Sequence, residues 1–79
     1  MAPPSIESVS AVVSRVANVP AIGADDDIFE AGLSSVDALR LLLELESAFN
    51  VAIPDDQFVD ARTPRDLTSM IGRLSEAGA

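Results

Sequence analysis

Two adjacent serines, Ser34 and Ser35, are the residues of this chain that could carry chemistry. They stand where a long acidic loop ends and the longest helical pattern of the sequence begins. Either serine can cap that helix, and Asp37 is spaced to complete a capping box with Ser34. One of the two hydroxyls is therefore expected at a helix N-terminus facing solvent, where a group can be attached to it.

Catalysis by these serines is not expected, because a nucleophilic serine needs a nearby base and a third group that orients that base. The chain contains no His and no Lys. The step Gly32-x-Ser34 is also not followed by Gly two residues later, as a nucleophile elbow requires. Because there is no Cys, any thioester chemistry must use a thiol brought from elsewhere. We therefore predict a protein that is not an enzyme.

The acidic run Asp25-Asp26-Asp27 raises the question of a calcium site. A calcium loop counted from Asp25 requires a bidentate Glu at its twelfth position, and Val36 stands there. Weak, nonspecific binding of divalent ions is the most that this run supports, so we assign no metal ligand.

The composition limits the size of the protein and the partners it can bind. The chain has 79 residues and a net charge of −8, with 13 acidic and 5 basic residues. A domain this small buries about 60% of its unfolded surface, so we expect one domain of modest stability. The charge argues against nucleic acid and anionic membranes and favours basic partner surfaces, although it could also serve solubility alone. No apolar run reaches the ~20 residues of a membrane span, and the N-terminus does not resemble a signal peptide.

Apolar residues at helical spacing predict three main helices and a short one. Asp55 is the expected cap of the short helix, and Thr63 with Pro64 forms the start signal of the last one. The four predicted helices cover residues 5–17, 35–49, 55–59 and 63–74. They predict an all-α fold, a small four-helix bundle with a long first loop.

The loop from Asn18 to Leu33 has no persistent period, and a loop this long in a compact domain is usually functional. We expect Phe29 to plug the core, and Phe58 and Val59 of the short helix to add to it. The apolar loop residues that should tie the loop to the bundle are Val19, Ile22, Ile28, Phe29 and Leu33.

The second helix has too many apolar residues for one face. One stripe should face the core, and it consists of Leu41, Leu42, Leu45 and Phe49. A neighbouring stripe starts beside the serines and consists of Val36, Leu39 and Leu43. With Asp37, Glu44 and Glu46 as a charged rim, this second stripe is typical of a docking surface. The alternative is that neighbouring helices bury both stripes.

At the two serines the sequence resembles the acyl and peptidyl carrier proteins. Their signature is a Gly, one intervening residue, a polar residue, the modified Ser and an apolar run on a helix. This chain reads Gly32-Leu33-Ser34-Ser35-Val36-Asp37-Ala38-Leu39. The resemblance continues through 27–32, 49–55 and 63–71, and counting back from Phe49 and Ile53-Pro54 places the family's modified serine on Ser35. Many carriers have Asp or His where this chain has Ser34.

The resemblance implies that a phosphopantetheinyl transferase attaches the 4′-phosphopantetheine arm of coenzyme A to Ser35. The thiol of the arm would carry acyl, aminoacyl or peptidyl groups as thioesters, and a helix N-terminus suits the attached phosphate. Arg40 stands where many fatty-acid carriers have Glu, which should change the partner surfaces that are accepted. We place partner docking on the second helix, at Val36, Leu39, Arg40, Leu43 and Glu46.

We therefore predict a non-catalytic carrier protein with a single domain, 1–79, whose ends fray at 1–4 and 76–79. It should be a cytoplasmic monomer that meets the transferase, a loading enzyme, and synthase or transferase partners with basic docking surfaces. A free-standing carrier of a polyketide, nonribosomal peptide or related specialised pathway fits better than the fatty-acid carrier, although an excised synthase domain would look the same. The alternative is a small acidic helical adaptor that is never modified.

Overall fold

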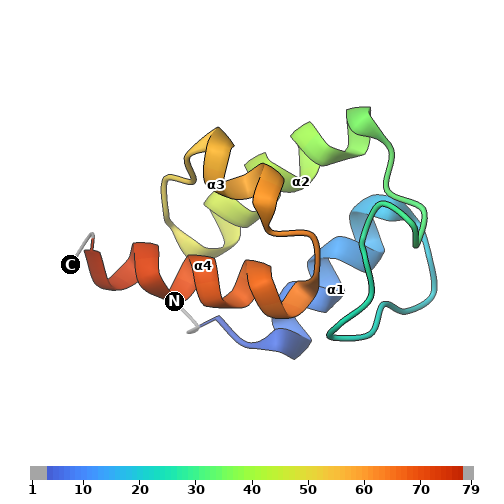
Figure 1. Ribbon diagram of the computed structural model, residues 1–79, viewed down its shortest axis with the longest axis horizontal. Helices are drawn as coiled ribbons and strands as arrows, with labels where there is room; N and C mark the ends of the chain where they lie inside the picture. Colours follow the sequence, from blue (N-terminus) through green and yellow to red (C-terminus); the bar gives the residue numbers. More distant parts are fainter. Residues whose placement is uncertain (1–3, 78–79) are drawn as a thin grey trace.

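The computed structural model describes residues 4–77, which form four helices and contain no strand. The helices are α1 (Ile6–Ala17), α2 (Ser35–Phe49), α3 (Asp55–Asp60) and α4 (Pro64–Ala77). α1 packs against both α2 and α4. In Figure 1, α2 and α3 lie on one side of the molecule and α4 on the other, and the long loop after α1 lies at the end of the bundle where α2 begins. The predicted all-α bundle is confirmed.

Local capping chemistry sets the helix ends where the sequence predicts them. The Ser5 hydroxyl accepts from the backbone N–H of Ser8 at 3.1 Å, and the Thr63 hydroxyl accepts from that of Asp66 at 3.1 Å. α1 and α2 both end at an asparagine in the left-handed conformation, Asn18 with φ 58° and Asn50 with φ 53°. Asparagine tolerates the left-handed conformation better than most residues, and a residue in this conformation ends a helix.

The core is apolar throughout, and no polar or charged residue is buried among residues 4–77. α2 contributes Leu41, Leu45 and Phe49 as predicted, whereas Leu42 is half-buried at the margin. The other buried apolar residues are Val9, Val12, Val13, Val16, Ile22, Ile28, Leu33, Ile53, Phe58, Ala61, Leu67, Met70 and Ile71. None of the helices in the described part of the chain is long and apolar enough to cross a membrane.

The long loop is tied to the bundle, as its apolar residues predict. Ile22, Ile28 and Leu33 are buried, and Val19 and Phe29 pack against the core from its margin. Phe29 is therefore not the internal plug that the sequence suggests. Its ring is half-buried, and the guanidinium of Arg62 lies 4.8 Å from the ring centroid. The guanidinium thus lies over the ring in a cation–π contact.

α3 differs from its prediction in two details. Pro54 occupies the N-cap position and Asp55 is the first helical residue, so no side chain caps this helix. Phe58 is buried, but Val59 is 62% exposed, because a helix of six residues turns only one side toward the core. α4 continues through Ala77, beyond the apolar pattern that ends at Leu74. Of the ends predicted to fray, 1–3 and 78–79 lie outside the described residues.

Candidate functional site

The structure gives the two adjacent serines different environments. Ser34 is the N-cap of α2, and its hydroxyl accepts from the backbone N–H of Asp37 at 3.1 Å. The Asp37 carboxylate accepts from the backbone N–H of Ser34 at 3.3 Å, which completes the capping box. Ser35 is the first residue of the helix and is exposed, and the capping box does not use its hydroxyl. Both serines are exposed, and what distinguishes them is that the Ser34 hydroxyl is engaged in the capping box whereas that of Ser35 is not.

The N-terminus of α2 suits a phosphate attached at Ser35. The first backbone N–H groups of a helix have no acceptor within the helix, and the helix dipole makes this end partly positive. The Ser34 hydroxyl satisfies the N–H of Asp37, the third helical residue. The N–H groups that precede it belong to Ser35 and Val36, next to the exposed hydroxyl. These N–H groups and the helix dipole favour an anion at this end of α2.

A tight turn delivers the chain to these serines. Gly32 has φ 131°, a conformation that strains any residue with a side chain, and a Cβ there would lie 3.3 Å from Cγ1 of Val19. The next residue, Leu33, is 4% exposed, and its N–H donates to the carbonyl of Ile28 at 3.0 Å. Gly32 allows the turn and Leu33 anchors it, so the position of Ser34 is set by the loop as well as by the helix.

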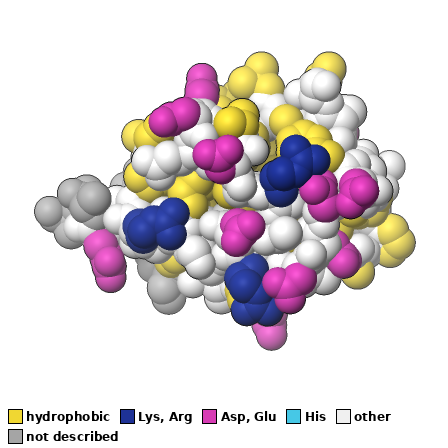
Figure 2. Space-filling model, in the orientation of Figure 1, with side chains coloured by type: hydrophobic (Ala, Val, Ile, Leu, Met, Phe, Trp, Pro, Cys, Tyr) yellow, Lys and Arg dark blue, Asp and Glu magenta, His cyan; other side chains and the backbone are white. Residues whose placement is uncertain are grey.

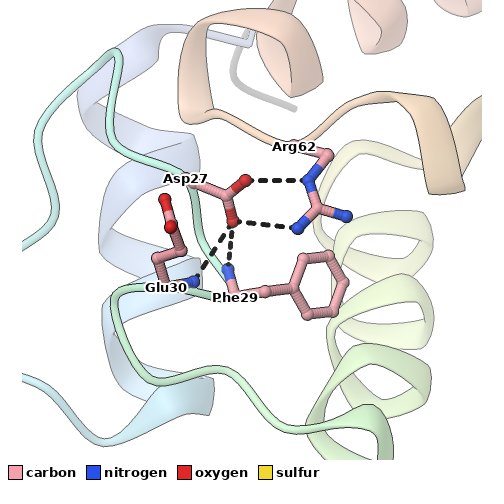
Figure 3. A network of polar contacts seen from close by, with 4 residues as sticks. All are labelled: Asp27, Phe29, Glu30 and Arg62. Atoms are coloured by element: carbon pink, nitrogen blue, oxygen red, sulfur yellow. Dashed lines mark hydrogen bonds and ion pairs between the residues drawn. The ribbon is translucent and has the colours of Figure 1, made fainter.

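Asp27 lies at the centre of a polar network that holds this part of the loop (Figure 3). Its carboxylate accepts from Nε of Arg62 at 2.7 Å and from Nη2 at 3.3 Å. The same carboxylate accepts from the backbone N–H groups of Phe29 and Glu30, at 2.9 and 3.2 Å. These hydrogen bonds favour the charged form, so they lower the pKa of Asp27, with the Arg62 guanidinium as the largest cause.

A second ion pair joins the loop to the first turn of α4. The Asp25 carboxylate accepts from Nε and Nη2 of Arg65 at 2.7 and 3.1 Å, and this contact lowers the pKa of Asp25. Two backbone hydrogen bonds run beside the ion pairs: Ile28 N–H to Arg62 O at 2.8 Å, and Arg65 N–H to Ala24 O at 2.9 Å. The loop is thus fastened by Arg62 to the α3–α4 connection and by Arg65 to the first turn of α4.

The acidic run therefore shapes the loop. Its middle residue, Asp26, accepts from the backbone N–H of Gly23 at 2.8 Å, while Asp25 and Asp27 bind arginines. No group of three potential metal ligands comes together in the described part of the chain. The arginine partners could not be read from sequence, because they lie 35 and 40 residues away from their aspartates.

The two ion pairs predict a pH dependence of stability. Because the pKa values of Asp25 and Asp27 are lower in the folded protein than in the unfolded chain, their stabilisation is complete at neutral pH. It should be lost as the pH falls below about 4 and passes through the lowered pKa values. Circular dichroism melts between pH 7 and pH 2 measure this loss. The double variant Arg62→Gln/Arg65→Gln should show a shallower decline, and parallel curves for both proteins would contradict the assignment.

The second apolar stripe of α2 lies at the surface. Val36 is 82% exposed, Leu39 62% and Leu43 57%, so the alternative that neighbouring helices bury it is wrong. Arg40 is exposed between them, and it makes no ion pair within residues 4–77. Figure 2 shows hydrophobic side chains along the edge of the molecule that α2 and α3 form, with acidic side chains beside them.

The acidic rim expected around this stripe is engaged within the protein. The Glu44 carboxylate pairs with Arg15 of α1 at 2.6 Å, and Asp37 belongs to the capping box. Glu46 is half-buried and accepts from the backbone N–H of Ile53 at 2.9 Å, so it holds the connection from α2 to α3. The structure thus gives Glu46 a structural role, and its part in docking stays a prediction.

Comparison with known proteins identifies the family. The family model described as the phosphopantetheine attachment site matches residues 7–71, which include the long loop, the two serines and all of α2. The chain belongs to the phosphopantetheine-binding carrier protein family.

Two relatives and one solved structure illustrate the relationship. This carrier is 46% identical over 56 residues to the D-alanyl carrier protein of Streptococcus suis, covering 67% of this chain and 71% of that protein. It is 29% identical over 70 residues to the isonitrile lipopeptide synthase of Mycobacterium tuberculosis, covering 89% of this chain but 3% of the synthase's length. Its fold matches hexanoyl acyl carrier protein from the actinorhodin polyketide synthase in Streptomyces coelicolor, with TM-score 0.78, 23% identity, and coverage of 96% and 95% of the two chains.

Membership of this family decides between the two functions that the sequence leaves open. The carrier is favoured over the unmodified adaptor, and 4′-phosphopantetheine is the group that is attached to members of this family. Carriers of this family work with synthase partners. The exposed hydroxyl at the start of α2 fits such a group, because it is accessible and lies at the positive end of a helix.

Proposed function

We propose that Ser35 is the attachment residue and that the chain holds acyl, aminoacyl or peptidyl groups as thioesters on its arm. The observation that supports this proposal is the difference between the two exposed serines: the capping box uses the Ser34 hydroxyl and leaves the Ser35 hydroxyl unused. When bound, the arm supplies the thiol that this Cys-free chain does not have. The role of the chain is to present that thiol to enzymes, which raises the effective concentration of the cargo.

Attachment at Ser35 is a phosphoryl transfer from coenzyme A. The Ser35 oxygen bonds to the phosphorus next to pantetheine in coenzyme A, and the bond from that phosphorus to adenosine 3′,5′-bisphosphate breaks. The hydroxyl proton goes to a base of the transferase. The capping box holds Ser34 and Asp37 in place, so the acceptor oxygen of Ser35 lies on a helix start that is already formed.

The proposal is tested by incubating the protein with coenzyme A, Mg²⁺ and a broad-specificity phosphopantetheinyl transferase, followed by intact mass spectrometry. One phosphopantetheine adduct per chain, with a thiol that then accepts an acyl group from a loading enzyme, is the expected result. A folded protein that gains no mass would overturn the proposal in favour of the unmodified adaptor. Mass is the appropriate readout, because the chain contains no Trp or Tyr.

The proposal includes docking of partner enzymes on the exposed face of α2. Val36, Leu39 and Leu43 form an apolar stripe that begins beside Ser35, and Arg40 adds a positive charge within it. Partners with basic surfaces suit the net charge of −8, and Arg40 favours those that place a carboxylate opposite it. We propose that the chain acts as a single-domain, monomeric carrier in the cytoplasm, in a polyketide, nonribosomal peptide or related specialised pathway.

Docking on α2 predicts that Leu39→Asp slows phosphopantetheine loading at least about tenfold in kcat/KM, since central apolar contacts dominate interfaces. Leu39 is exposed, so the circular dichroism spectrum and the melting temperature should change little. Val59→Asp is the matched control, because Val59 of α3 is also 62% exposed and receives the same charge. Equal loading of Leu39→Asp and wild type, or equal slowing by both substitutions, would refute docking at this stripe.

A further inference from the structure

We propose that Asp27 and Arg62 are positioning residues, which hold the end of the long loop so that Ser35 is presented to the transferase. The inference rests on the proposed function of Ser35. Neither residue touches the serines, and both act through the loop that leads to them.

Asp27 shapes the loop and also anchors it. Its carboxylate accepts two backbone N–H groups of the following turn, from Phe29 and Glu30, and its carbonyl accepts the N–H of Ala31 at 2.9 Å. The Arg62 guanidinium then fixes that carboxylate to the α3–α4 connection and covers the ring of Phe29. One aspartate thus determines both the turn at 27–31 and its place on the bundle (Figure 3).

A short series of contacts links this anchor to the attachment residue. Ile28 follows Asp27, is fully buried, and donates its N–H to the carbonyl of Arg62. The carbonyl of Ile28 accepts the N–H of Leu33, which is also buried. Ser34, the N-cap of α2, is the next residue. A shift of the anchor therefore reaches the start of α2 through buried, hydrogen-bonded backbone.

The ion pair between Asp25 and Arg65 provides a matched comparison within the same loop. It has the same bidentate form, with distances of 2.7 and 3.1 Å, and it joins the same loop to the first turn of α4. The Asp25 carboxylate does not cap the turn at 27–31, and the backbone hydrogen bond beside it involves Ala24 and Arg65, upstream of the turn. Loss of this pair should leave the path to Ser35 intact.

Global stability is not the expected role of the Asp27–Arg62 pair. The Arg62 side chain is 52% exposed and that of Asp27 24%, and an ion pair with one partner largely in solvent contributes little to the free energy of unfolding. The rate of loading should depend more strongly on this pair than the free energy of unfolding does. Phosphoryl transfer requires the Ser35 oxygen to align with the phosphorus under attack, so the start of α2 must be ordered. A misplacement of about 1 Å can lower a rate by up to about a hundredfold.

The test compares Asp27→Ala, Arg62→Gln and Asp25→Ala with the wild type in the transferase assay, at a temperature where circular dichroism shows all four folded. Asp27→Ala, which loses the turn caps and the anchor, should lower kcat about tenfold, and Arg62→Gln, which loses only the anchor, about threefold. KM should change little, because the apolar stripe of α2 is untouched. Asp25→Ala should stay within about twofold of the wild type. Hydrogen exchange at the amide of Leu33 should be faster in the first two variants and unchanged in Asp25→Ala.

Equal kcat values for the wild type and Arg62→Gln would overturn the inference, even if Asp27→Ala failed to fold. Equal losses in Arg62→Gln and Asp25→Ala would also overturn it, because they would show a general effect of loop charge. The proposed function fails separately, since a wild-type protein that gains no phosphopantetheine refutes the function of Ser35 whatever the variants do.

Discussion

Ser35→Ala is expected to abolish phosphopantetheine attachment completely, and Ser34→Ala is expected to preserve it. The substitution at Ser35 removes the acceptor oxygen, and the neighbouring hydroxyl cannot replace it without leaving the capping box. Ser35 is exposed and supplies no cap, so its variant should fold and melt like the wild type. The measurement is the intact mass after the transferase reaction, with peptide mapping to place the adduct.

Ser34→Ala is the matched control, because it removes the other hydroxyl and nothing else. It should lower the free energy of unfolding by about 1 kcal/mol, the usual cost of replacing a Ser N-cap. Loading should continue, with some loss of rate if the first turn of α2 frays. An adduct that disappears in Ser34→Ala and persists in Ser35→Ala would show that the attachment residue is one position earlier than we propose.

The helices could be predicted because their signals are local. The periodic valines of α1, the Thr63-Pro64 start of α4 and the uninterrupted apolar pattern of α2 each lie within one segment. Ser34 and Ser35 could both be recognised as cap candidates, and the spacing to Asp37 favours Ser34 as the cap that the structure shows. The exposure of Val36, Leu39 and Leu43 was one of two possibilities, since the helical pattern cannot show which stripes a neighbouring helix covers.

The features that the sequence could not supply depend on distant contacts. Asp27 and Arg62 are 35 residues apart, and neither is unusual in its own segment. Glu46 belongs by spacing to the rim of a docking face, but its carboxylate binds the backbone of Ile53 after the helix has ended. Val59 was expected in the core because a helix of six residues has too few turns to show a period.

The long loop is part of the core, and this determines how mutations in it should behave. Loops usually cross the surface and tolerate change. Here Ile28 is completely buried, its N–H donates to the carbonyl of Arg62, and its carbonyl accepts from the N–H of Leu33 within the loop. Its side chain lies in the same cluster as residues from α1, α2 and α4. The loop therefore contributes to global stability as a helix does.

Ile28→Ala is consequently expected to lower the free energy of unfolding by about 2–5 kcal/mol, through lost apolar burial and the cavity that remains. At about 0.05–0.15 kcal/mol per residue, a 79-residue domain has roughly 4–12 kcal/mol in total, so this change removes a large part of it. Urea unfolding followed by circular dichroism at 222 nm measures the difference.

Val59→Ala is the control for that experiment, because it also truncates a β-branched residue but at a position that is 62% exposed. It should change the free energy of unfolding by less than about 0.5 kcal/mol. If Ile28→Ala were as mild as Val59→Ala, the loop would not be packed as the structure shows. The contacts from Asp27 through Ile28 and Leu33 to the start of α2 would then not be rigid. The stability of this single variant therefore tests both the fold of the loop and the basis for positioning Ser35.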